Sequence, residues 1–222
     1  MSRNNTRLPG PLFIDIDGVE LTAEDRDILR HPLYWEPRYR EYFPEQLKNL
    51  ASHELYHAVN RVAVTPIRVD ADEVTYNLHI MLRFDLEKRL FDGSLEPRDL
   101  PEAWNEASGR ILGYVPKNNR EGCLQDVHWS GGAFGYFPSY CLGNLLAAQL
   151  WYRLREDLPR LDEQIERADY RPLLRWLREN IHSKGRRYYT LEFTRDVTGR
   201  ELSPDFLVRY LKERYLPLYT GS

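Results

Sequence analysis

The chain has 222 residues, of which 42% are hydrophobic, 13% aromatic and 29% charged. This length is sufficient for one well-buried domain with a small N-terminal appendage, and the composition excludes a largely disordered chain. The formal net charge of −3, with arginines interspersed among acidic residues, gives no general electrostatic attraction to nucleic acid or to anionic membranes.

Residues 1–30 are expected to form a tail, a β hairpin and a short helix, and residues 31–219 a single helical domain. The runs LFIDI and VELT flank Asp17-Gly18, a dipeptide that favours a two-residue hairpin turn. Hydrophobic periodicity predicts helices over 44–50, 53–63, 71–91, 101–111, 139–157, 160–167, 171–181, 191–197 and 204–215. The expected fold class is therefore all-α, a mostly helical domain with a small N-terminal β hairpin.

The sequence also indicates a compartment. No apolar run approaches 18 residues, so we expect no membrane-spanning segment. The polar N-terminus is not followed by a hydrophobic segment of the signal-peptide type. Cys123 and Cys141 form neither a zinc-site spacing nor a disulfide framework. A reduced, cytoplasmic setting is the expectation.

The run HELYH at 53–57 has the spacing of a zinc-peptidase helix. His53 and His57 share a helix face and can reach one zinc, Glu54 can activate water, and Asp72 or Glu73 could be a third ligand. The apolar positions of the same helix are Leu55, Ala58, Val59 and Val62. The histidines and Asn60 lie opposite them, on the face expected to meet water rather than a cleft. A surface helix is therefore favoured, and a metal site at His53 and His57 remains the alternative.

A second group of polar residues lies on the predicted helix over 71–91. Asp72, Tyr76, His79 and Arg83 follow one another at helical spacing, so they share one face. This face is either a solvated surface with modest ion pairs or the wall of a polar cleft. The pair Asp70-x-x-Glu73 predicts a capping box at the start of the helix.

The segment 122–149, GCLQDVHWSGGAFGYFPSYCLGNLLAAQ, combines chemistry-bearing side chains with glycines and aromatics. Gln125, Asp126 and His128 lie within four residues, and an apolar helix follows. Glycines allow close backbone approach, and polar groups on a loop that is mounted on a helix are typical of a site. The alternative is a turn whose polar side chains bond to the backbone.

Two motifs together resemble a known family. Gly122-x-x-Gln125-Asp126-x-His128-Trp129 and Ile67-Arg68-x-x-Ala71-Asp72-Glu73 resemble signatures of the carboxypeptidase Taq family of zinc metallocarboxypeptidases, and the likeness to its C-terminal half extends from about Tyr34 to Tyr215. The resemblance implies removal of C-terminal residues from peptides by zinc-activated water. The family's zinc-binding His-Glu-x-x-His helix precedes the matching region, so we expect no zinc or other cofactor to be bound by this chain itself.

The resemblance also implies roles for individual residues. Arg68 would hold the terminal carboxylate of a peptide, because its planar fork suits bidentate binding; the alternative is a salt bridge to Asp70 or Asp72. His128 and Tyr136 would be catalytic, since either can donate a hydrogen bond to the developing oxyanion. Gln125 would contact the substrate backbone. Asp126 would orient His128 or cap the following turn.

Three functions are consistent with this sequence. In the first, the chain is one half of a split enzyme, and a separate zinc-bearing chain completes its site and covers an apolar face, which self-association could also cover. In the second, it is a compact zinc metallopeptidase that uses His53 and His57. In the third, it is an inactive relative that binds the C-terminus of a peptide. Neither nucleic acid nor a membrane is an expected partner.

Overall fold

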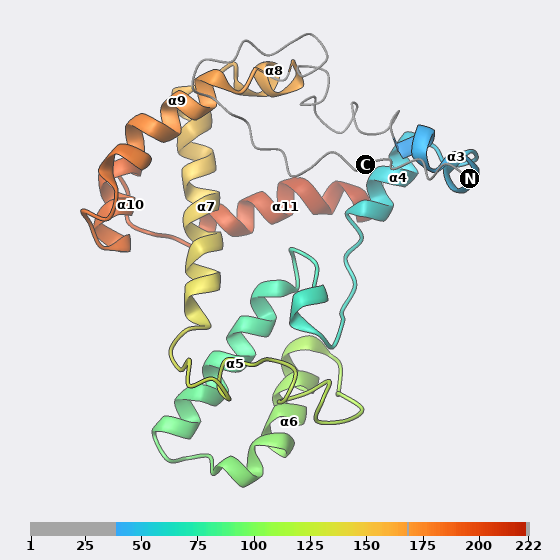
Figure 1. Ribbon diagram of the computed structural model, residues 1–222, viewed down its shortest axis with the longest axis vertical. Coiled ribbons are helices and arrows are strands. Elements are labelled where there is room, and N and C mark those ends of the chain that lie inside the picture. Colours follow the sequence, from blue (N-terminus) through green and yellow to red (C-terminus); the bar gives the residue numbers. More distant parts are fainter. Residues whose placement is uncertain (1–38, 168, 221–222) are drawn as a thin grey trace, which may run out of the picture.

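The computed structural model describes residues 39–167 and 169–220, and over these residues the chain is helical, with no β-strand (Figure 1). The all-α prediction is confirmed for this part of the chain. The predicted β hairpin and short helix within residues 1–30 lie outside the described residues. Over the described helices, none combines the length and the apolar character that a membrane span requires.

The α-helices are α3 (Pro44–Leu47), α4 (Ser52–Val59), α5 (Tyr76–Phe91), α6 (Leu100–Leu112), α7 (Pro138–Asp157), α8 (Leu161–Glu166), α9 (Arg171–Asn180), α10 (Thr190–Thr198) and α11 (Asp205–Thr220). Short 3-10 turns occur at η1 (Arg68–Asp70), η2 (Pro97–Asp99) and η3 (His182–Lys184). Prolines occupy the first turns of α6, α7 and α9, where their missing N–H costs no helical hydrogen bond.

The start of α5 differs from the prediction. The helix begins at Tyr76, five residues later than the predicted start at 71. The Oδ1 atom of Asp72 accepts the backbone N–H groups two and three residues later, each at 2.9 Å, which holds these residues in a turn instead of a helix. The prediction that Asp70 and Glu73 cap this helix is therefore wrong, because the helix begins at Tyr76, its N-cap is Thr75, and no side chain caps it.

The first hydrophobic core lies between α5 and α6. Its buried members are Leu82, Leu86, Leu95, Ala103, Trp104, Ala107, Leu112 and Cys123. Burial of such side chains contributes about 25 cal/mol for each Å² of apolar surface removed from water. Trp129, from the loop that connects α6 to α7, packs against this core and so fixes the loop on the α5–α6 lobe.

A second core lies at the other end of the molecule, where α7 meets α8, α9 and α10. Leu154, Leu161, Trp176 and Val197 are its buried members. The long helix α7 belongs to both ends, since it contacts α5 near one terminus and α10 and α11 along the rest of its length (Figure 1). This helix therefore sets how the two lobes are placed relative to each other.

Helix α11 returns the end of the chain to the segment that precedes α5. The Tyr215 hydroxyl donates to Glu73 Oε2 at 2.6 Å, and Arg214 Nη2 donates to Asn60 Oδ1 at 2.9 Å. Glu73 therefore ties the η1 segment to α11. The helix predicted over 53–63 ends at Val59, and the Asn60 side chain bonds back to a carbonyl of that helix.

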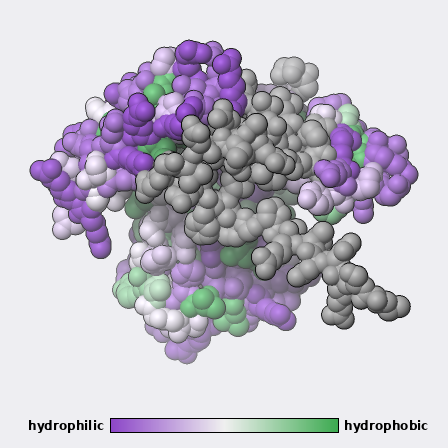
Figure 2. Space-filling model, turned by 45° about the horizontal axis from the view of Figure 1, so that its top comes forward, coloured by the Kyte–Doolittle hydropathy of each residue, from purple (hydrophilic) through white to green (hydrophobic). Residues whose placement is uncertain are grey.

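One face of α5 carries exposed apolar residues, with Lys88 among them. Met81, Phe84 and Phe91 lie on the same side of the helix and are 50%, 43% and 69% exposed, and the Phe91 ring contacts the ring of Phe134. We call these three α5 residues the α5 stripe. Figure 2 shows hydrophobic residues at the surface of the lower end of the molecule, which is the end formed by the α5–α6 lobe.

Candidate functional site

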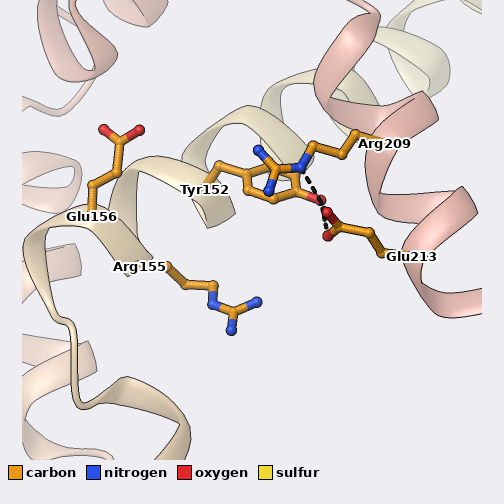
Figure 3. A pocket seen from close by; sticks show the side chains of 5 residues that line it. All are labelled: Tyr152, Arg155, Glu156, Arg209 and Glu213. Carbon is orange, nitrogen blue, oxygen red and sulfur yellow. Dashed lines mark hydrogen bonds and ion pairs between the residues drawn. The ribbon is translucent and has the colours of Figure 1, made fainter.

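A shallow groove of about 420 Å³ lies between α7 and α11, lined by Tyr152, Arg155, Glu156, Arg209 and Glu213 (Figure 3). Its central charges are already paired, because Glu213 accepts hydrogen bonds from Arg209 Nε and from the Tyr152 hydroxyl, each at 2.7 Å. Burial, together with the bond to Glu213, raises the pKa of Tyr152 to about 12. These contacts join two helices, and the groove contains none of the motif residues.

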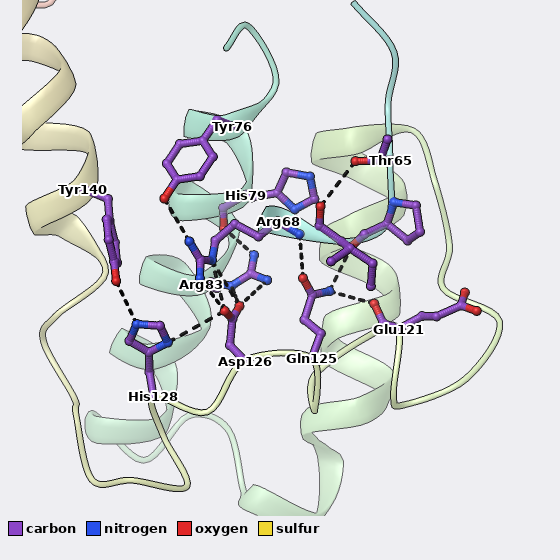
Figure 4. Close-up of polar contacts among 12 residues, drawn as sticks. Thr65, Arg68, Tyr76, His79, Arg83, Glu121, Gln125, Asp126, His128 and Tyr140 are labelled. Atoms are coloured by element: carbon purple, nitrogen blue, oxygen red, sulfur yellow. Dashed lines mark hydrogen bonds and ion pairs between the residues drawn. The ribbon is translucent and has the colours of Figure 1, made fainter. Parts of the chain in front are cut away.

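The motif residues meet elsewhere, around Asp126 (Figure 4). The η1 turn contributes Arg68, which donates from Nη2 to Asp126 Oδ1 at 2.6 Å and from Nε at 3.1 Å. Helix α5 contributes Arg83, whose Nε lies 2.7 Å and whose Nη2 lies 2.6 Å from Asp126 Oδ2. One carboxylate from the α6–α7 loop thus bridges the guanidinium groups of two consecutive elements that are far from it in the sequence. We call Arg68, Arg83 and Asp126 the Asp126 cluster.

The Asp126 cluster is almost closed to solvent. The side chains of Arg68, Arg83 and Asp126 are 7%, 0% and 12% exposed. Burial alone would raise the pKa of Asp126, but hydrogen bonds from Arg68 and the positive charge of Arg83 lower it below its ordinary value. Burial lowers the pKa of Arg83 to about 10, against the attraction of Asp126. All three groups are therefore charged near neutral pH.

Arg68 forms its salt bridge with Asp126, and the predicted alternative partners Asp70 and Asp72 do not take part. Its Nη1 donates to the Tyr76 hydroxyl at 2.8 Å. These contacts use three of the five guanidinium N–H groups, so one N–H on each terminal nitrogen is left for a further acceptor. Arg68 is therefore a structural link that keeps two N–H donors.

Gln125 joins the same two segments through its amide. Its Nε2 donates to Pro66 O at 2.9 Å and to Glu121 O at 2.7 Å, and its Oε1 accepts the backbone N–H of Arg68 at 2.8 Å. Both N–H groups of the amide are therefore engaged by the chain's own backbone. The predicted contact of Gln125 with a substrate backbone would use the second lone pair of Oε1.

His128 lies beside the Asp126 cluster and contacts a tyrosine that the sequence did not single out. Its Nε2 is 3.0 Å from the Tyr140 hydroxyl, and its Nδ1 is 3.7 Å from Asp126 Oδ1. The imidazole packs on the Phe137 ring with 4.5 Å between centroids. Asp126 therefore faces His128, as one of its two predicted roles requires. Tyr140 is in the first turn of α7, which directs it toward the loop; this position was the available signal.

Tyr136 is the most exposed member of this aromatic group. Its side chain is 51% exposed, and its ring lies 5.7 Å from the His128 ring and edge-on to Tyr140 at 5.4 Å. The two predicted catalytic residues, His128 and Tyr136, are thus brought together. Exposure increases from Asp126 through His128 to Tyr136, so the polar group opens to solvent on the side of the loop.

Glu87 is a second residue that sequence reasoning missed. It is 6% exposed on α5, and its carboxylate accepts the Trp129 indole N–H at 2.7 Å and the backbone N–H of Gly135. Gly135 has φ +71°, a conformation that other residues rarely adopt. Glu87 therefore holds both ends of the glycine-rich segment that lies between His128 and Tyr136.

The polar face of α5 is buried. His79 and Arg83 are 1% and 0% exposed, and Tyr76 bonds to Arg68. The solvated-surface interpretation is therefore wrong for His79 and Arg83, and the wall of a polar cleft stays a prediction. Burial and the charge of Arg83 lower the pKa of His79 to about 4, so it is neutral near neutral pH.

The HELYH segment does not form a metal site in the described structure. His53 and His57 are exposed on α4, and the His57 ring lies against Tyr219 with 5.2 Å between centroids. The proposed third ligands are used elsewhere, since Asp72 accepts backbone N–H groups just before α5 and Glu73 bonds to α11. Within 39–167 and 169–220, no three His, Cys, Asp or Glu side chains converge as metal ligands. These residues do not fit a zinc ion.

The two faces predicted for this helix are also only partly correct. The histidines are exposed as predicted, but Val59 is 72% exposed instead of buried. Asn60, which was placed on the water-facing side, is buried because it bonds to Arg214 of α11. The apolar face of α4 therefore has no core beneath it among the described residues.

Comparison with known proteins gives a consistent assignment. Residues 24–215 match the family described as carboxypeptidase Taq (M32) metallopeptidase. The chain is 42% identical over 193 residues to carboxypeptidase 1 of Bacillus subtilis, covering 86% of this chain and 38% of that protein. It is 45% identical over 189 residues to thermostable carboxypeptidase 1 of Thermus thermophilus, covering 84% and 37%. The chain thus spans less than two fifths of these relatives.

Solved structures show the same arrangement of helices. The M32 carboxypeptidase of Deinococcus radiodurans matches with a TM-score of 0.81 and 39% identity, over 88% of this chain and 39% of that one. Metallocarboxypeptidase 1 of Trypanosoma cruzi matches with a TM-score of 0.75 and 42% identity, over 81% and 38%. In both cases the likeness covers most of this chain and a minor part of its relative.

Proposed function

The chain belongs to the carboxypeptidase Taq (M32) metallopeptidase family, and we propose that it supplies the substrate-side half of a peptide site that a separate zinc-bearing chain completes. The observation that carries this proposal is the assembled Asp126 cluster. Arg68 of η1 meets Asp126 and His128 of the α6–α7 loop, and no set of metal ligands is found among the described residues. A site built for substrate, without the metal, is what one half of such an enzyme requires.

The charges of the cluster favour the carboxylate of a peptide C-terminus as the ligand. Arg68 and Arg83 carry two positive charges against the single negative charge of Asp126. In a nearly dry environment such an excess favours a further anion. Arg68 retains one N–H on each terminal nitrogen, so it still has donors for the oxygens of a carboxylate. Glu87, one turn along α5 from Arg83, takes its hydrogen bonds from the loop instead.

The exposed apolar residues support a protein partner. The α5 stripe presents Met81, Phe84 and Phe91 to solvent, and Val59 of α4 is similarly exposed. Large apolar patches on a soluble protein are typical of interaction surfaces. The relatives carry more than three fifths of their length outside the matched region, so a partner that corresponds to that part is the occupant we propose.

The proposal is tested by complementation. We would express this chain together with the part of Bacillus subtilis carboxypeptidase 1 that precedes the matched region, supply zinc, and measure release of C-terminal amino acids from short peptides. We expect release with both chains and none with this chain alone. Arg68→Lys should reduce release about 10-fold or more, because a lysine cannot replace a bidentate contact, whereas Arg110→Lys on the exposed side of α6 should not.

Two results would assign another function. Release by this chain with zinc alone, abolished in His57→Ala, would establish the compact peptidase and exclude the split enzyme. Binding of a peptide that depends on Arg68, with no release in any combination, would identify an inactive peptide-binding relative.

A further inference from the structure

The Tyr140 hydroxyl is connected to Asp126 of the cluster through the His128 imidazole. Asp126 faces Nδ1 of His128, and Nε2 of the same imidazole contacts the Tyr140 hydroxyl at 3.0 Å. Asp126 and His128 have side chains that are 12% and 16% exposed, and Tyr140 is half-buried. The three residues form a polar chain from the nearly buried Asp126 to the half-buried Tyr140 (Figure 4).

The surroundings of His128 determine which nitrogen carries its proton. Nδ1 is buried without a hydrogen-bond partner, and the nearest charge is Asp126 Oδ1 at 3.7 Å. A lone pair on Nδ1 would repel that carboxylate, whereas an N–H is attracted to it. The neutral imidazole therefore carries its proton on Nδ1. Nε2 is then the acceptor, and the Tyr140 O–H donates to it.

The rest of the environment keeps the Tyr140 ring in place. The Arg68 guanidinium lies 5.2 Å from the ring centroid, and the rings of Tyr76 and Tyr136 meet it edge-on at 6.4 and 5.4 Å. With its proton committed to His128, the phenolic oxygen directs its lone pairs away from the imidazole. It is therefore an oriented acceptor beside the guanidinium that is proposed to hold a carboxylate.

We propose that Tyr140 contacts the bound peptide and accepts a hydrogen bond from a main-chain N–H near its C-terminus. His128 and Asp126 act through it as positioning residues, because they fix the direction of the Tyr140 O–H. This inference rests on the proposed peptide site, and it gives Tyr140 a contact with the peptide backbone that differs from the oxyanion contact predicted for His128 and Tyr136. His128 in this arrangement has no free donor for an oxyanion.

The first measurement concerns the tautomer of His128 and needs no ligand. In ¹⁵N-labelled full-length chain, we expect NMR to show a proton on Nδ1 and a hydrogen-bonded, unprotonated Nε2. Tyr140→Phe should shift the Nε2 resonance toward that of a free acceptor and leave the proton on Nδ1. A proton found mainly on Nε2 would overturn the assignment of Tyr140 as an acceptor.

The second measurement tests the contact with peptide. Trialanine with a free C-terminal carboxylate is titrated into the chain, alone and with its complementing partner, and the dissociation constant is read from chemical shifts. Tyr140→Phe should weaken binding about fivefold, the value of one ordinary hydrogen bond. Tyr152→Phe is the matched control, since it removes a hydrogen-bonded hydroxyl from the same helix, and it should leave the affinity unchanged.

Variants of His128 separate positioning from packing. His128→Gln can still accept the Tyr140 O–H and should retain affinity within twofold, whereas His128→Leu should weaken binding as much as Tyr140→Phe does. If both weaken it equally, His128 acts only by packing and the positioning role is wrong. If the wild type binds and Tyr140→Phe binds equally well, this inference fails and the peptide site stands. If the wild type binds no peptide in either state, the peptide site itself fails.

Discussion

At the scale of single residues, His79 couples the stability of the chain to pH. Its pKa is about 4 in the folded chain and 6.5 when unperturbed, because burial and the charge of Arg83 disfavour the imidazolium. Between these values the unfolded chain binds a proton that the folded chain does not. The contribution of neutral His79 is therefore complete above pH 6.5 and is lost as the pH falls toward 4, about 3 kcal/mol in all.

We accordingly expect the free energy of unfolding in urea to decrease over that pH interval in the wild type. In His79→Gln the decrease should be much smaller, because the titrating group is absent. His182→Gln, which changes an exposed histidine in η3, should behave as the wild type does. An equal slope in His79→Gln and the wild type would contradict the assignment. Asp126 titrates in a different pH range. Because its pKa is lowered in the folded chain, its contribution to stability is lost only as the pH falls below 3.8.

Removal of the Asp126 carboxylate should cause a large loss in the free energy of unfolding. Asp126→Asn leaves two buried guanidinium groups facing a neutral amide, and breaking a buried ion pair from one side costs about 3–5 kcal/mol. We expect that loss in urea unfolding at neutral pH. Asp162→Asn removes the partner of Arg155 at the surface, where such pairs contribute about 0–1 kcal/mol. Similar losses in the two variants would show that the cluster is not a buried network.

At the scale of elements, the glycine-rich loop depends on Glu87 of α5. Glu87→Gln replaces one acceptor oxygen by an NH₂ group, which must then face either the Trp129 indole N–H or the Gly135 N–H. We expect faster amide exchange at Gly135 and a shifted Trp129 indole resonance, with a local cost of about 1–3 kcal/mol. Glu106→Gln on the exposed face of α6 is the control. Unchanged exchange at Gly135 would show that the loop holds its own shape.

The elements also show what the sequence could and could not predict. The helices expected over 101–111, 139–157 and 171–181 agree with α6, α7 and α9 within one residue at each end, because prolines mark their starts and apolar periodicity extends through them. The predicted start at 71 failed because the Asp72 side chain competes for backbone N–H groups. The end predicted at 63 failed because Asn60 bonds to α11, a contact that local pattern cannot reveal.

The sequence predicted several residues of the site but not the hydrogen bonds and ion pairs that connect them. The motifs identified Arg68, Asp126 and His128, and the fold brings them together. Tyr140 and Glu87 were missed because each acquires its role from a partner 12 to 48 residues away. The only local signal for Tyr140 was its place in the first turn of the helix that follows the motif loop, and a glutamate in a charged helix carries none. Only the packing of α5 and α7 around the loop gives them partners.

At the scale of the whole molecule, the α5 stripe should govern association. We expect the wild type to self-associate with increasing concentration in sedimentation velocity, since the exposed apolar face gains by being covered. Phe84→Ser with Phe91→Ser should keep the chain monomeric and should weaken complementation. Val208→Ser, which changes an exposed apolar residue of α11, should leave both properties unchanged. A wild type that is monomeric at every concentration and binds no complement would contradict a docking role for the stripe.

Helix α7 carries Tyr140 in its first turn and Leu154 in the core that it shares with α8, α9 and α10. Fourteen residues separate the two, about 21 Å of continuous helix. Because a continuous helix is stiff, a rotation of α7 at Leu154 also moves its first turn, where Tyr140 lies. Repacking the core around Trp176 would therefore shift the Tyr140 hydroxyl relative to His128 without changing either residue. A change in the Tyr140–His128 hydrogen bond would then report on packing at the far end of α7.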